Sequence, residues 1–89
     1  MVVKLIKENG MGKTFETEKF KILYRIKDSI GGNNTINPEE VIYFITGKAQ
    51  ITLEEKTWNV EAPAKVHFPA KTYHKIKALT DISFIIFES

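Results

Sequence analysis

Apolar and polar residues alternate in short stretches along most of the chain. The clearest stretch covers residues 19–27, where Phe20, Ile22, Tyr24 and Ile26 alternate with lysine, leucine and arginine. This period of two is typical of a β-strand with one dry face and one wet face. We therefore expect the four named residues to face a core and Arg25 to face solvent.

The same alternation predicts four further strands. Their expected inward residues are Ala49, Ile51 and Leu53; Trp58 and Val60; Val66 and Phe68; and His74, Ile76 and Ala78. Turn signals such as Asn9-Gly10, Thr46-Gly47 and Ala62-Pro63 separate the runs, and no segment keeps a helical period over three turns. The pattern predicts an all-β fold, a small antiparallel β-barrel or sandwich that hides its strand edges.

Two runs, residues 41–46 and 82–87, are apolar on both faces. A strand of this kind is covered on each side, by a core on one side and by a second sheet or subunit on the other. We expect their outer faces to form the interface of a homodimer. The length supports pairing, because a chain of 89 residues buries little more than roughly 60% of its unfolded surface by itself.

Composition places the chain as one domain, residues 1–89, in the cytoplasm. It contains no cysteine, which excludes disulfides and thiolate metal sites and fits an intracellular protein. Lys4 and Lys7 interrupt the apolar N-terminal run, which therefore predicts neither a signal peptide nor a membrane span. The net charge of +2 is too small to indicate nucleic-acid binding by itself.

Two spaced motifs carry a family resemblance. Glu40 precedes Gly47 with six residues between them, and Pro69 precedes His74 with four residues between them. Over residues 30–89 this arrangement resembles the cupin signature motifs, G-x5-H-x-H-x3 or 4-E-x6-G and G-x5-P-x-G-x2-H-x3-N. The resemblance implies a jelly-roll barrel, or double-stranded β-helix. It also implies a divalent metal held by two histidines and the glutamate of the first motif and by the histidine of the second.

The metal ligands of that family are incomplete here. Its paired histidines would fall on Asn34 and Ile36 or on Asn33 and Thr35, and Pro63, Lys71 and Ala78 replace two glycines and an asparagine of the second motif. Glu40 and His74 remain as metal candidates. Two missing ligands should weaken metal binding by at least roughly 100-fold to 10,000-fold. We therefore expect no tightly held metal, and a weakly held divalent ion is the alternative.

His74 shares its strand face with Ile76 and Ala78 and should point into the barrel. Its simplest role is that of a buried polar group that hydrogen-bonds to Glu40 or to a backbone carbonyl. His67, by its alternation with Lys65, should point to solvent.

Three functions follow from these residues. The first is binding of a small molecule in a pocket with Glu40 and His74 as polar groups and apolar walls, formed by Ile42, Phe44, Val66, Phe68, Ile76 and Ile86. The second is an isomerase-like or dioxygenase-like enzyme in which Glu40 and His74 act as an acid–base pair, or hold a weak metal. The third is single-strand nucleic-acid binding by one wet face that carries Lys65, His67, Lys71, Tyr73, Lys75 and Lys77. The low net charge and the single arginine argue against the third.

Overall fold

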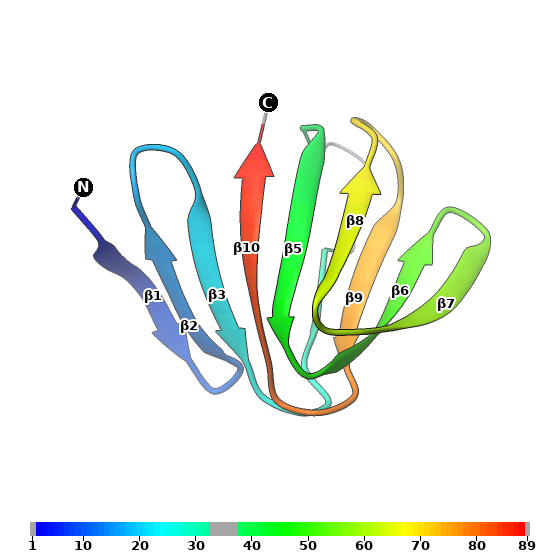
Figure 1. The fold of residues 1–89 in the computed structure, drawn as a ribbon, viewed down its shortest axis with the longest axis horizontal. Helices are drawn as coiled ribbons and strands as arrows, with labels where there is room; N and C mark the ends of the chain where they lie inside the picture. The colour runs from blue at the N-terminus through cyan, green and yellow to red at the C-terminus, as the bar shows by residue number, and fades with distance from the viewer. Residues whose placement is uncertain (1, 33–37, 89) are drawn as a thin grey trace.

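The computed structural model describes residues 2–32 and 38–88, and within them every regular element is a strand (Figure 1). The strands are β1 (Lys4–Asn9), β2 (Gly12–Glu16), β3 (Lys21–Arg25), β4 (Ile30–Gly31), β5 (Glu40–Thr46), β6 (Lys48–Leu53), β7 (Lys56–Glu61), β8 (Ala64–Phe68), β9 (His74–Ala78) and β10 (Ile82–Glu88). The predicted all-β class is confirmed. These residues contain no helix, and hence none that could cross a membrane.

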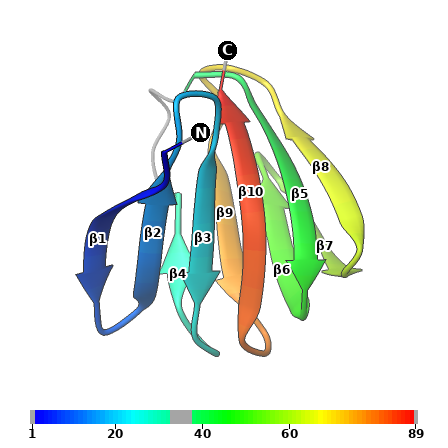
Figure 2. The ribbon, with the colours of Figure 1, turned by 60° about the vertical axis from the view of Figure 1, so that its left-hand side comes forward.

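The strands form two antiparallel sheets that face each other (Figure 2). One sheet has six strands in the order β1-β2-β3-β10-β5-β8, and the other has four in the order β4-β9-β6-β7. Strands far apart in the sequence become neighbours, since β10 lies between β3 and β5. The sheets cover each other's apolar faces, and the core lies between them.

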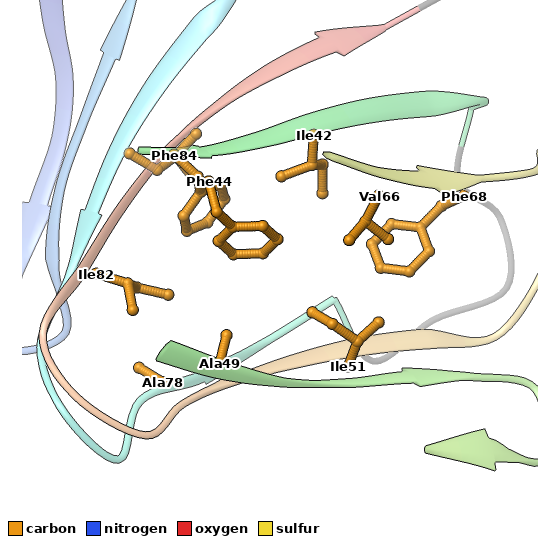
Figure 3. Close-up of a cluster of buried hydrophobic side chains, with 10 residues drawn as sticks. Ile42, Phe44, Ala49, Ile51, Val66, Phe68, Ala78, Ile82 and Phe84 are labelled. Carbon is orange, nitrogen blue, oxygen red and sulfur yellow. The ribbon is translucent and has the colours of Figure 1, made fainter. Parts of the chain in front are cut away.

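The core joins large side chains of the six-stranded sheet to small ones of the four-stranded sheet. Phe44 and Phe84 pack with ring centroids 5.2 Å apart. Ala49 and Ala78, which are register partners on β6 and β9, lie on the opposite layer (Figure 3). Both alanines are fully buried. Because neither alanine extends toward the phenylalanines, two aromatic rings fit between the sheets without forcing them apart.

The inward face predicted for β3 is wrong. Leu23 is buried at 8% exposure, whereas Tyr24 and Ile26 are about half exposed at 50% and 51%. Paired residues of neighbouring strands share a face. Leu23 pairs with the buried Thr14 and Phe84, so its parity is fixed by β2 and β10. The stretch forms a strand as predicted, but the face that turns inward is the more polar one, which carries Leu23 between Lys21 and Arg25.

Trp58 also departs from its predicted place. It pairs with the buried Ile51 and so has the expected parity, yet it stays 37% exposed. The reason is that β7 is the last strand of its sheet and lies beyond β8 at the end of the molecule (Figure 1). The parity of Trp58 thus places it on the inner face of its sheet. Because β7 is the terminal strand, few neighbouring residues cover that face.

The predicted turn at Thr46-Gly47 is present and needs its glycine. Gly47 has φ +88°, and a Cβ atom there would lie 2.2 Å from the backbone oxygen of Asp81. The backbone of the β5–β6 hairpin thus packs directly on the loop before β10. A side chain at this position would push the two loops apart.

Candidate functional site

A cavity of about 180 Å³ lies between the two sheets. Four polar residues line it, namely Arg25, Ser29, Glu40 and His74. Its walls are otherwise apolar and are formed by Leu23, Ile42, Ile76, Ala78, Ile82, Phe84 and Ile86. Gly31 and Gly32, which are exposed, also line it and give it access to solvent.

The structure brings only some of the predicted pocket residues to this cavity. Glu40, Ile42, His74, Ile76 and Ile86 line it. Phe44, Val66 and Phe68 instead belong to the packed core, where they are 2%, 5% and 0% exposed. Figure 3 shows Val66 and Phe68 facing Ile51, away from Ile82 and Ala78. Interdigitated side chains fill the part of the sandwich next to β8, and the space remains beside β3 and β4.

Glu40 and His74 meet in the cavity, as the simplest reading of His74 predicts. Nε2 of His74 lies 3.2 Å from Oε1 of Glu40, and both side chains are largely buried. The imidazole also stacks on the Phe68 ring, with centroids 4.1 Å apart and parallel planes. A Cβ atom at Gly32 would lie 3.1 Å from the imidazole Cδ2. Aromatic stacking and close backbone packing therefore fix the ring against Glu40.

Burial moves the pKa values of these two groups in opposite directions. It raises the pKa of Glu40, and the negative charge of Glu88 and a hydrogen bond with Glu88 raise it further, while Lys21 lowers it. Burial lowers the pKa of His74. The neutral imidazole therefore predominates at neutral pH. When Glu40 is ionised it can only accept a hydrogen bond, so Nε2 carries the imidazole proton.

Sequence reasoning missed two polar residues of the cavity, Arg25 and Ser29. The error in the face of β3 placed the side chain of Arg25 in solvent, whereas it lines the cavity on the same face as Leu23. Its Nη1 donates to the carbonyl oxygens of Lys13 at 3.0 Å and Tyr24 at 2.9 Å, and its Nη2 donates to Oγ1 of Thr14 at 2.9 Å. A signal was present in the sequence, since Arg25 is the single arginine beside twelve lysines.

The donor set does not fit the metal centre that the motif resemblance implies. The two remaining motif ligands, Glu40 and His74, are hydrogen-bonded to each other. Within residues 2–32 and 38–88 no group of three histidine, cysteine or acidic side chains is arranged to hold a metal ion. The positions of the missing histidines, residues 33–36, lie outside the described residues and contain asparagine, threonine and isoleucine.

The basic wet face proposed for nucleic acid is not a single face. Lys65 and His67 lie on the outer side of β8 in the six-stranded sheet. Lys75 and Lys77 lie on β9 in the four-stranded sheet. Because the two sheets face each other, their outer sides point in opposite directions (Figure 2). His67 is exposed as predicted and pairs with Glu39 at 2.8 Å.

Comparison with solved structures identifies the fold. CapF of Staphylococcus aureus, a capsular polysaccharide assembling protein, superposes over 98% of this chain with a TM-score of 0.79 at 15% identity. Bacillus subtilis oxalate decarboxylase, which has Mn(II) centres, superposes over 97% of the chain with a TM-score of 0.76 at 19% identity. A cupin superfamily protein of Desulfitobacterium hafniense superposes over 98% of the chain with a TM-score of 0.71 at 10% identity.

The chain therefore has the cupin fold, as its two motifs predict. It spans 28% of CapF and 28% of oxalate decarboxylase, but 75% of the Desulfitobacterium protein. No family model matches the sequence, and no curated protein matches it. At these identities the likeness defines the architecture, so an argument about function has to rest on the cavity itself.

Proposed function

We propose that this cupin-fold protein binds one small molecule in the cavity between its sheets. The observation that carries the proposal is the cavity itself, about 180 Å³ with apolar walls and four polar residues among those that line it. Binding sites for small molecules usually combine apolar walls with a few placed polar groups. A protein cavity of roughly 150 Å³ accepts benzene, so this one suits a molecule with a single ring.

A pair of adjacent residues on β10 provides the test. Ile86 lines the cavity, while Ile85 points to the outer face of the same sheet. We expect benzyl alcohol or benzoate to bind the wild type saturably, with NMR shifts centred on cavity amides. Ile86→Phe should project a larger, rigid ring into the cavity, reduce the space for a ligand and weaken binding at least about tenfold. Ile85→Phe, the same change outside the cavity, should leave the affinity within about twofold. If neither probe gives saturable cavity shifts, the proposed function is wrong.

A second candidate is an enzyme that uses Glu40 and His74 for proton transfer. The observation in its favour is their 3.2 Å contact at the edge of the cavity, with pKa values that burial displaces in opposite directions. Such a pair can pass a proton between a carboxyl group and an imidazole. It ranks second because an acid–base pair is only part of a catalytic set, whereas the binding proposal needs only the cavity and the residues that line it.

A further inference from the structure

Arg25 introduces a positive charge into an otherwise apolar part of the cavity. It follows Leu23 by two residues on the inner face of β3 and pairs across the sheet with Ile82, another cavity residue. Its hydrogen bonds to the carbonyls of Lys13 and Tyr24 and to Thr14 hold the guanidinium in place. Thr14 is itself buried at 6% exposure, so one of the three bonds fixes the guanidinium to the interior, while the bonds to the carbonyls of Lys13 and Tyr24 are exposed.

This charge has no acidic counterpart in the described part of the chain. Ion pairs form there at Lys13, Lys21 and Lys48, but none forms at Arg25. A guanidinium has five N–H donors, and three of them are used in the bonds to Lys13, Tyr24 and Thr14. Two donors remain. Because partly buried charges are normally paired, the unpaired cation indicates a site for an anion.

Glu40 is the acidic side chain of the cavity, and it does not fill this role. It contacts His74, and its register partner on β10 is Glu88. Arg25 pairs instead with Ile82, six residues earlier on the same strand. At about 3.3 Å per residue, the backbones of these two positions are roughly 20 Å apart. The two side chains therefore extend from well-separated backbone positions, and they form no ion pair with each other in the described residues.

Ser29 is the polar residue that accompanies Arg25. Its backbone carbonyl accepts a hydrogen bond from the amide of Ala78 at 2.9 Å, which ties it to the end of β9 remote from His74. Both Ser29 and Ala78 line the cavity. A hydroxyl can donate to an anion already held by an arginine. The cavity thus has one cationic end and one carboxyl–imidazole end, with apolar walls between them.

We propose that the ligand is a small monocarboxylate whose carboxylate binds Arg25 and Ser29 and whose apolar body fills the cavity. This inference rests on the proposed function and specifies its ligand class. One arginine, with no lysine among the cavity residues, balances one negative charge and leaves a dianion such as phosphate half unpaired. The planar guanidinium matches a carboxylate in two parallel hydrogen bonds. The volume limits the body to about one ring.

The test compares benzoate with benzyl alcohol, which has a similar body and no charge, by NMR titration. For the wild type we expect benzoate to bind at least about tenfold more tightly than benzyl alcohol. Arg25→Gln should weaken benzoate about 10-fold to 100-fold and leave benzyl alcohol within about twofold. Lys27→Gln makes the same charge change two residues away at an exposed position, and both affinities should stay within about twofold.

The outcomes separate the two proposals. If both probes bind with equal affinity, or if Arg25→Gln leaves benzoate unchanged, the monocarboxylate inference is wrong and the binding function stands. If neither probe binds, both are wrong. If Arg25→Gln does not fold, a salt titration of the wild type tests the inference instead. Added KCl should lower the affinity for benzoate and leave the affinity for benzyl alcohol unchanged, and an unchanged benzoate affinity would contradict the inference. Arg25→Lys should then retain part of the preference, since it keeps the charge and loses the planar fork.

Discussion

At the scale of single residues, the opposite pKa displacements of Glu40 and His74 predict opposite effects of pH on stability. His74 has a pKa lowered from 6.5, so the folded protein binds fewer protons there than the unfolded chain. Its contribution to stability is complete above 6.5 and is lost as pH falls through the folded pKa. We therefore expect the stability advantage of wild type over His74→Gln to grow as pH rises toward 6.5, in urea unfolding between about pH 5 and about pH 8.

Glu40→Gln is the matched variant with the reverse sign. The pKa of Glu40 is raised above 4.5, so the folded protein holds this proton more tightly than the unfolded chain does. The advantage of wild type over Glu40→Gln should therefore shrink as pH rises from 4.5 through the folded pKa. Glu88 and Lys21 act on the charge of Glu40, so their contributions to its pKa are part of the measured difference. Parallel pH slopes for the two variants would contradict the assignment.

At the scale of elements, the turn between β8 and β9 contains a left-handed backbone conformation that favours glycine, but a lysine occupies that position. Lys71 occupies a glycine position of the cupin motif and has φ +59°. We expect Lys71→Gly to raise the free energy of unfolding by about 0.5–1 kcal/mol, because it relieves a left-handed backbone at a cost in chain entropy. Ala70→Gly, one residue earlier without a positive φ, should lower it by a similar amount. Urea unfolding measures both, and a loss of stability in Lys71→Gly would refute the argument.

The strands also show what the sequence could and could not predict. Alternation and turns were sufficient for the all-β class, and the parity of β9 correctly placed His74 inside at 3% exposure. The residues of β3 indicate the wrong face, because the face of Ile22 and Tyr24 is more apolar than the face on which Leu23 lies between two cationic residues. Register with β2 and β10 decides the inward face. Because Arg25 has the same parity as Leu23, the wrong face for β3 also prevented the prediction of Arg25 as a cavity residue.

At the scale of the whole molecule, the cavity depends on the spacing of two layers, and no local pattern encodes that spacing. Phe44 and Phe68 were predicted to line it together with Ile42, as apolar walls of the barrel interior. The structure separates them because buried side chains fill the sandwich near β8 and leave a cavity near β3 and β4. A pocket is the volume that side chains leave unfilled, so predicting one requires the complete three-dimensional packing.

The outer face of the six-stranded sheet predicts how two copies of the chain assemble. The strands β3, β10 and β5 are adjacent in this sheet. We define its outer patch as five exposed residues: Tyr24 on β3, Ile26 directly after β3, Tyr43 and Ile45 on β5, and Phe87 on β10. Phe87 packs edge-on against Tyr43 with centroids 5.8 Å apart, so the patch is a preformed surface. An apolar patch on so small a protein favours association. A net charge of +2 opposes contact between two copies only weakly.

We therefore expect a homodimer with this patch at its two-fold interface, with light scattering giving twice the 10.2 kDa mass of the chain. Ile45 is 52% exposed in the patch, and Ile45→Lys should shift the protein to monomers because the interface would have to bury two unpaired charges. Ile30 is 42% exposed on β4 of the other sheet, and Ile30→Lys should leave the dimer intact.

Because dimerisation stabilises the folded state by mass action, the wild-type Tm should rise with protein concentration, and the Tm of Ile45→Lys should not. A wild type that stays at 10.2 kDa with a constant Tm would mean that the patch meets a different partner or none.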